Sequence, residues 1–422
     1  MISRTRWLLR RLSRELWFRA TIFAALGFVA AMAGVIAERY MAWQPPTRVT
    51  PQTVERILDI LASSMLAVTT FSLNVMVTAY GSATSNVTPR ATKLLRQDST
   101  TQNALGAFIG AFLFSLVGIV SLGTELYGDR GRLVLFVVTL AVIAFVITAM
   151  LRWIDHLSGL GRVGETARIV EDAAREALLD RARAPTLGAR PYDPAQPMNP
   201  RAARVTTERI GYVQHIDLGE ISGIAERDKC AVYIVEPPGG FVFAAEPLAF
   251  VLTDSGEAPS RETIAAIERA FTIADHRSFD QDPRFGLSVL AEIASRALSP
   301  AINDPGTAID VIGRAARLLL EYARTPQETG EAVFPRLRLA PLSASDLLAD
   351  AFSPIARDGA ANVEVQIRLQ KALAALARAP NGDLRAAAVA EARFAIDHAE
   401  IALALDSDKQ KLRGFNAAVS AL

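Results

Sequence analysis

Cysteine is nearly absent from this sequence, because Cys230 is the single one among 422 residues. One thiol cannot form an intrachain disulfide or a cysteine-rich zinc or iron–sulfur centre. Charged residues are also scarce, at 21% of the chain, whereas soluble domains average about 25%. Hydrophobic residues make up 51%, and the mean hydropathy is +0.23. The composition excludes a disordered chain and a small disulfide scaffold, and it leaves a surplus of apolar residues to be placed.

Motifs of common catalytic sites are missing as well. The four histidines are scattered, and no HExxH, GxSxG or GxxxxGK[ST] pattern occurs. Residues 159–164 read GLGRVG and satisfy GxGxxG, but an apolar span precedes them where a dinucleotide site needs a strand. We therefore predict that the protein is not an enzyme, and we assign it no cofactor and no metal ligands.

Charge and tryptophan divide the chain into two parts. Residues 1–153 hold 15 lysines and arginines against seven acidic residues, whereas residues 154–422 hold 30 against 37. All four tryptophans lie in the first part, just outside apolar runs, as is typical of side chains at a membrane interface. The acidic second part disfavours nucleic acid as a partner. The first third is predicted to be embedded in a lipid bilayer.

Four apolar stretches are long enough to cross about 30 Å of hydrocarbon as helices. They are Ala20–Ala37, Ile57–Tyr80, Ala104–Leu122 and Leu133–Leu151. Ten basic residues flank these spans on the side of the N-terminus and five on the other side, which predicts cytoplasmic N- and C-termini. The alternative is a cleavable signal peptide that ends at Ala31-Met32-Ala33, and it would invert this topology.

Polar residues follow one face of the second span. Steps of three and four positions place five of them together, and we call this set the polar stripe: Asp59, Ser63, Thr70, Asn74 and Thr78. Polar groups inside a bilayer need protein or water beside them, so this face is not expected to face lipid. Two interpretations remain open. The stripe either packs against another helix or lines a pore between several subunits, with Asp59 near the outer mouth.

After residue 153 the pattern changes to that of an α+β region. We predict a helical stalk and proline-rich linker over 154–203, a small β module over 204–255, and a mainly helical domain over 256–422. The predicted helices of the last region form a bundle and cover Thr263–Ile273, Phe285–Leu298, Ala308–Tyr322, Val363–Ala377 and Leu384–Leu405. Ser353-Pro354 is a further candidate helix start.

The densest polar cluster lies between residues 276 and 305. Two helices are predicted to begin there with the same device, Asp282-Pro283 and Asp304-Pro305, in which aspartate caps free N–H groups. Arg277 is expected to close the intervening turn with Asp280. A structural role and a binding role are both open for this cluster. Its candidate residues are Arg277, Asp280, Gln281, Asp282, Arg296, Ser299, Asn303 and Asp304.

These features resemble a bacterial family of predicted membrane proteins called domain of unknown function 2254. The resemblance rests on the basic N-terminus, the four spans, the GYV of Gly211–Val213, the cluster from Asp282, and above all the run ALSPAINDP at Ala297–Pro305. It implies a membrane region followed by a cytoplasmic domain in the bacterial inner membrane, and it transfers no catalytic residue.

Two functions are compatible with these patterns. The first is a homo-oligomeric channel or transport protein whose polar stripe lines the conduit and whose cytoplasmic domain assembles or gates it. The second is a non-conducting membrane scaffold or sensor whose cytoplasmic domain binds a partner or a small ligand. The sequence identifies neither an ion nor a small-molecule ligand.

Overall fold

The computed structural model describes residues 12–13, 15–40, 49–96, 98–124, 126–157, 159, 161–327 and 330–420. These residues form two compact units. The membrane unit contains the described residues up to 85 and residues 89–166, and the sheet–helix unit contains residues 167–420 together with 86–88. Five of the ten basic residues predicted to hold the N-terminus in the cytoplasm lie outside the described residues, namely Arg4, Arg6, Arg10, Arg11 and Arg14.

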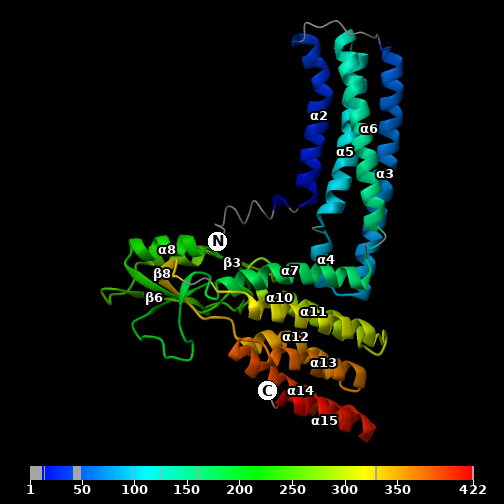
Figure 1. The fold of residues 1–422 in the computed structure, drawn as a ribbon. Helices are drawn as coiled ribbons and strands as arrows, with labels where there is room; N and C mark the ends of the chain where they lie inside the picture. The colour runs from blue at the N-terminus through cyan, green and yellow to red at the C-terminus, as the bar shows by residue number, and fades with distance from the viewer. Residues whose placement is uncertain are drawn as a thin grey trace. The chain divides into compact units, whose positions relative to one another are not determined.

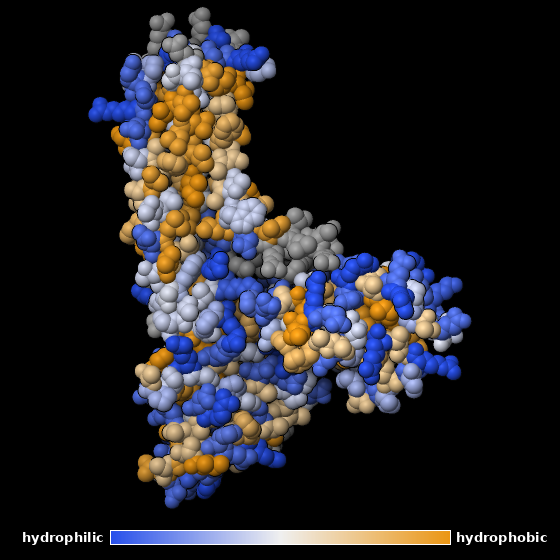
Figure 2. All heavy atoms as spheres, turned by 180° about the vertical axis from the view of Figure 1, so that it is seen from behind, coloured by the Kyte–Doolittle hydropathy of each residue, from blue (hydrophilic) through white to orange (hydrophobic). Residues whose placement is uncertain are grey.

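The membrane unit is built from long apolar helices (Figure 1). Four of the described helices are long and apolar enough to cross a membrane, and each contains one predicted span: α2 (Leu16–Tyr40), α3 (Pro51–Asn86), α5 (Ser99–Gly123) and α6 (Asp129–Leu157). The short helix α4 (Pro89–Arg96) connects α3 to α5. Figure 2 shows hydrophobic side chains along much of the visible face of this unit.

Glycines allow α2 and α5 to approach closely. A Cβ atom placed on Gly27 would lie 2.3 Å from the carbonyl oxygen of Gly110, and one placed on Gly106 would lie 2.5 Å from the Phe23 ring. Gly106 and Gly110 form a GxxxG spacing, which permits such contacts between membrane helices. The α2–α5 contact therefore depends on the absence of side chains at these positions.

Trp153 departs from the interfacial position expected of the tryptophans. It is buried in the membrane unit, and its indole N–H donates to the Ser72 hydroxyl of α3 at 3.0 Å. Trp17 is exposed, whereas Trp7 and Trp43 lie outside the described residues. A tryptophan at the end of an apolar run can thus pack inward when a neighbouring helix supplies an acceptor.

The predicted stalk does not continue α6. Helix α6 ends at Leu157, Gly161 adopts a left-handed conformation with φ +81°, and α7 (Val163–Arg183) begins as a separate helix. The proline-rich segment that follows contributes an edge strand to a sheet, β1 (Ala189–Pro191).

The sheet–helix unit contains two sheets. The five-stranded sheet has the order β1-β8-β4-β6-β2, with β8 parallel to both of its neighbours, and the three-stranded sheet has the antiparallel order β5-β3-β7. Their other strands are β2 (Ala203–Thr206), β3 (Gly211–Ile216), β4 (Cys230–Ile234), β5 (Phe241–Val242), β6 (Pro247–Thr253), β7 (Phe271–Ala274) and β8 (Phe334–Leu339). Strands β1, β7 and β8 lie outside the 204–255 segment that was predicted to form the β module.

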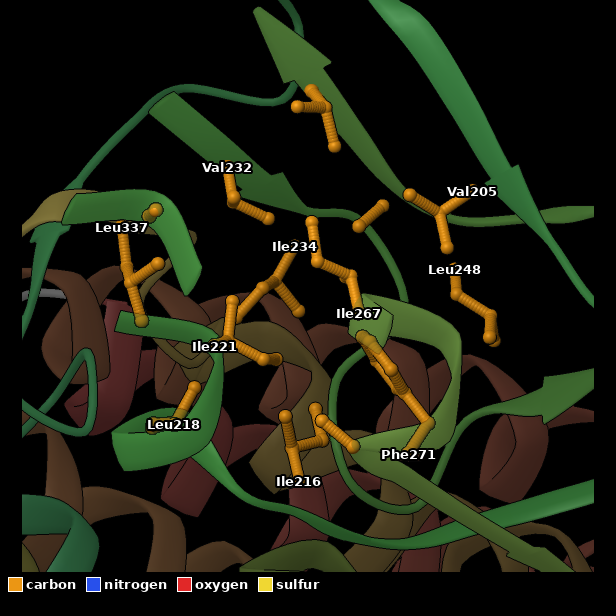
Figure 3. Close-up of a cluster of buried hydrophobic side chains, with 14 of the residues drawn as sticks. Val205, Ile216, Leu218, Ile221, Val232, Ile234, Leu248, Ile267, Phe271 and Leu337 are labelled. Atoms are coloured by element: carbon orange, nitrogen blue, oxygen red, sulfur yellow. The ribbon is translucent and has the colours of Figure 1, made fainter. Parts of the chain in front are cut away.

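A single apolar core joins these sheets to α8 (Leu218–Arg227) and α9 (Arg261–Arg269). Figure 3 shows how side chains from both sheets and both helices meet. Ile221 of α8, Ile267 of α9 and Val232 of β4 are fully buried in it. Every second residue of β4 is buried, as is typical of a strand that turns one face toward a core.

The sheet–helix unit also contains three helical hairpins, and β8 lies between the first and the second in the sequence. Contacts run in two series, α10 to α12 to α14 and α11 to α13 to α15, as in stacked helical repeats (Figure 1). The helices are α10 (Pro283–Ala297), α11 (Pro305–Arg324), α12 (Ala344–Asp358), α13 (Val363–Ala377), α14 (Gly382–Ala402) and α15 (Asp406–Ser420). The last predicted helix, Leu384–Leu405, corresponds to α14, and α15 follows it outside the predicted ranges.

Two further predictions for this region were wrong. Pro354 does not begin a helix but lies inside α12, which starts at the Ser343 cap. Burial of Leu347, Phe352 and Ile355 outweighs the backbone hydrogen bond that Pro354 cannot make. The end of the helix predicted over Thr263–Ile273 is strand β7, because it pairs with β3.

Close packing of α7 on α10 yields a stability prediction. A Cβ on Gly286 would lie 2.3 Å from the Cβ of Ala174, so Gly286→Ala is expected to destabilise the protein by about 1–3 kcal/mol. The control is Gly313→Ala in α11, where a Cβ meets nothing within 4 Å; it should stabilise by roughly 0.5–1 kcal/mol. Unfolding of the purified protein measures both, and equal effects would contradict the packing described.

Candidate functional site

The polar stripe lies on the outside of the membrane unit. Asp59, Ser63, Thr70, Asn74 and Thr78 are all exposed. The opposite side of α3 is the one that packs, and there Leu58, Leu61 and Met65 are buried. Leu58 meets α5 at Gly118, and Ser72 meets α6 at Trp153. The stripe therefore faces away from the described part of its own chain.

The stripe hydroxyls bond to their own helix. Ser63, Thr70 and Thr78 each donate to a carbonyl oxygen four residues earlier, at 2.9–3.0 Å. Among the described residues, no hydrogen bond joins a stripe side chain to another helix. These bonds use the hydrogen of each hydroxyl but leave lone pairs of its oxygen available on the outer face of α3. The side-chain amide of Asn74 lies on the same face.

The candidate residues between 276 and 305 divide between the two ends of α10. Arg277, Asp280, Gln281 and Asp282 lie at its start, whereas Arg296, Ser299, Asn303 and Asp304 lie at its end. A helix of 15 residues is about 22 Å long, so the two groups are too far apart to contact one ligand. The sequence cluster is therefore two local sites.

At the start of α10, the Asp282 carboxylate is buried and pairs with Arg277. The guanidinium of Arg277 donates from Nε at 2.7 Å and from Nη2 at 3.0 Å. Asp282 also accepts from the backbone N–H groups of Arg284 and Phe285, which confirms the predicted cap. The expected pairing of Arg277 with Asp280 was wrong, because the bidentate geometry is met by Asp282 and Asp280 instead accepts from Ser278.

Neighbouring segments close around this pair. A Cβ on Gly239, whose φ is +97°, would lie 2.4 Å from the Asp282 carboxyl carbon, so only glycine fits this turn. The Arg277 guanidinium lies 5.0 Å from the centre of the Phe285 ring. Gln281 accepts from the Ile216 N–H at 3.0 Å, which connects the segment to β3. This end of α10 joins the sheets to the helical hairpins.

At the end of α10, the candidate residues form the connection to α11. Asp304 accepts from the Thr307 N–H and hydroxyl, as its predicted capping role requires. Asn303 has a φ of +50°, a left-handed conformation that asparagine tolerates. Ser299 donates to the Arg296 carbonyl at 2.6 Å, and the side chain of Arg296 is exposed. These contacts account for the run ALSPAINDP as a tight turn between two helices.

Metal-binding geometry does not occur in the part of the chain that is described, because no three His, Cys, Asp or Glu side chains there could hold a metal ion. Asp310 pairs with Arg314 at 2.7 Å. The GxGxxG segment lies between α6 and α7, so it lacks the strand that a dinucleotide site requires.

Sequence reasoning missed two features of the sheet–helix unit. The first is an open groove of about 870 Å³, lined by residues 191–194, residues 340–345 and the α14 residues Asp383, Ala386, Ala387 and Ala390. Its walls come from three distant segments, so no local pattern could reveal it. The second is the buried Glu171 of α7, which accepts from Arg314 and Arg317 of α11, each at 2.8 Å.

The two Asp-Pro caps differ in burial, and this difference yields a prediction. Asp282→Ala removes a buried carboxylate and leaves the partly buried Arg277 without its partner, so we expect a loss of roughly 3 kcal/mol in unfolding free energy. Asp304→Ala removes a partly exposed cap and should cost about 1 kcal/mol. Unfolding of both variants in parallel checks the ratio, and equal losses would show that Asp282 acts only as a cap.

Glu236 beside the Gly239 turn predicts a pH dependence. Burial, reinforced by Glu246, raises the pKa of Glu236 to about 7 from its ordinary 4.5. The native state then binds a proton that the unfolded chain has released, so this group's stabilising effect is lost as pH rises from 4.5 through 7. Glu236→Gln should match the parent near pH 5 and unfold at higher temperature than the parent at pH 8. The exposed Glu257→Gln is the control, and an unchanged pH profile in Glu236→Gln would contradict the assignment.

Comparison with known proteins agrees with this architecture. The family model described as "Predicted membrane protein (DUF2254)" matches residues 13–375. Uncharacterized proteins of Mycobacterium bovis and Mycobacterium tuberculosis are each 25% identical over 338 residues, which cover 74% of this chain and 61% of the relative. The match thus spans about three fifths of the length of these relatives. No solved structure matches the chain. The chain belongs to the DUF2254 family of predicted membrane proteins, as the resemblance carried by its sequence indicated.

Proposed function

We propose that the protein is an oligomeric channel or transport protein, in which copies of α3 surround a conduit and present the polar stripe to it. The observation that supports this most directly is the position of the stripe, opposite the face of α3 that packs within the chain. A stripe used only to hold the four helices of one chain together would face inward.

The free energy of polar groups in a bilayer favours a shared conduit. A charged side chain at the centre of a membrane helix costs about 2.5–3.5 kcal/mol on insertion scales, and polar groups there usually meet protein or water. Asp59 and Asn74 meet neither within the described part of their own chain. Several chains arranged with α3 toward a common axis would give both groups water, and would turn Leu66 and Phe71 toward neighbouring protein or lipid.

The sheet–helix unit is assigned to assembly or gating. We infer that this unit lies in the cytoplasm, at the inner membrane of a bacterium. The inference rests on the excess of basic residues that flank the spans on the side of the N-terminus. The alternative function, a non-conducting scaffold or sensor, is favoured by the stacked hairpins and by the groove between residues 191–194, 340–345 and α14. In that case the stripe would only join copies of the chain.

Flux through liposomes tests the proposal. Asn74→Leu replaces an exposed amide of the stripe with an alkyl group, and an added barrier of about 1.4 kcal/mol would lower ion flux roughly tenfold. Thr70→Val should lower it less, because its hydroxyl already bonds to Leu66. The control is Thr148→Val on α6, an exposed threonine that also bonds to its own helix but lies outside the stripe.

The parent protein decides between the two functions. A strictly monomeric parent that leaves liposomes no more permeable than empty ones would end the channel proposal. An oligomer that conducts nothing, with Asn74→Leu weakening its assembly, would support the scaffold.

A further inference from the structure

The groove of about 870 Å³ lies where three parallel strands end. Strands β1, β8 and β4 run in the same direction, and the residues at their carboxyl ends, Pro191, Leu339 and Ile234, are aligned in the register. In open α/β sheets, ligands bind in crevices outside the carboxyl ends of such strands. Here residues 192–194 follow β1, residues 340–345 follow β8, and α14 supplies the third wall. The volume is in the range of sites that bind small organic molecules.

Contacts with β4 hold the wall that follows β1. The Tyr192 hydroxyl donates to the Ile234 carbonyl oxygen at 3.2 Å, and the rings of Tyr192 and Tyr233 meet edge to face with their centres 5.7 Å apart. The Asp193 carboxylate accepts from the Ala195 N–H at 2.9 Å, which engages one of its two oxygens. This wall is therefore formed before a ligand binds, and no ordering of it opposes binding.

Negative charge reaches the groove from two of its walls. Asp193 belongs to the wall after β1, Asp383 belongs to the first turn of α14, and both are exposed. Within the described part of the chain, no ion pair joins either carboxylate to a basic side chain, and none of the lining residues is basic. The groove therefore complements a ligand that carries positive charge at two separate points.

The rest of the lining is mostly proline, alanine and leucine. Its two serines, Ser343 and Ser345, bond to each other through their hydroxyls at 2.8 Å, and Ser343 also accepts from the Asp346 N–H at the start of α12. These polar atoms are thus engaged within the protein. The surface that remains for a ligand is aliphatic, and methylene groups cover such a surface favourably.

Two other kinds of cationic ligand match this lining less well. A divalent metal ion needs about six oxygen ligands, whereas among the described residues no three His, Cys, Asp or Glu side chains could hold one. A peptide that pairs along the sheet edge needs N–H donors, and Pro191, Pro194 and Pro341 have none. A ligand whose charges are joined by an alkyl chain requires neither feature.

We propose that the groove binds an aliphatic polyamine, whose ammonium groups pair with Asp193 and Asp383 and whose methylene chain lies against the proline and alanine side chains. An ammonium group has three donors, and its hydrogen bonds to a carboxylate are charge-assisted. The 37 acidic residues against 30 basic ones in residues 154–422 raise the local concentration of cations. This site goes beyond the proposed conduit, and binding and ion flux are measured separately.

Isothermal titration calorimetry of the full chain in a nonionic detergent tests the proposal, with spermidine as the probe. We expect saturable binding of about one spermidine per chain, with a Kd below about 1 mM. Butylamine carries a single charge and should bind at least about tenfold more weakly. Succinate carries charges of the opposite sign and should not bind. The absence of saturable spermidine binding up to about 10 mM would overturn the proposal.

Variants locate the polyamine in the groove. Asp193→Asn and Asp383→Asn each remove one charge with little change of shape, and each should weaken spermidine binding roughly two- to fivefold. Their effects should multiply in the double variant. The matched control is Asp397→Asn, which removes the same charge from an exposed position of α14 outside the groove and should leave binding unchanged. Equal weakening by Asp397→Asn and Asp383→Asn would indicate attraction to the acidic surface as a whole and overturn the site.

A trilysine peptide provides the comparison with a basic protein partner. We expect it to bind more weakly than spermidine, because its backbone amides lose water against aliphatic walls without gaining hydrogen bonds. Tighter binding of trilysine than of spermidine, weakened by Asp193→Asn and Asp383→Asn, would assign the groove to a basic peptide and show that the polyamine assignment is wrong.

Discussion

The buried carboxylate of Asp282 is the interaction on which the sheet–helix unit depends. It caps α10, pairs with Arg277 from the segment after β7, and packs against the Gly239 turn after β4. Three separate parts of the chain therefore meet at one side chain. Helix α10 supplies N–H donors, Arg277 supplies the opposite charge, and the Gly239 turn packs against the carboxylate. Oδ1 of this carboxylate accepts from Arg277 Nη2 and from the backbone N–H groups of Arg284 and Phe285, and Oδ2 accepts from Arg277 Nε. The interaction that begins α10 is thus the same one that joins the sheets to the hairpins.

A different constraint governs the membrane unit. Helix α3 has 36 residues and is about 54 Å long, which is well beyond the roughly 30 Å of hydrocarbon that a membrane span has to cross. Its buried face resembles that of an ordinary packed helix, with Leu58, Met65 and Met76. Its outer face keeps polar atoms over five turns. A single chain buries the first face and leaves the second exposed, and the proposed assembly of several chains would accommodate both.

Local patterns predicted the elements well where one face or one cap determines them. The caps at Asp282 and Asp304 follow from short-range signals, and the structure confirms them. Contacts between distant segments were not accessible in this way. Strand β8 pairs with β1 and β4 across more than 100 residues. The stripe on α3 was visible as a face, but only the packing of α5 and α6 on the other side shows that it points outward.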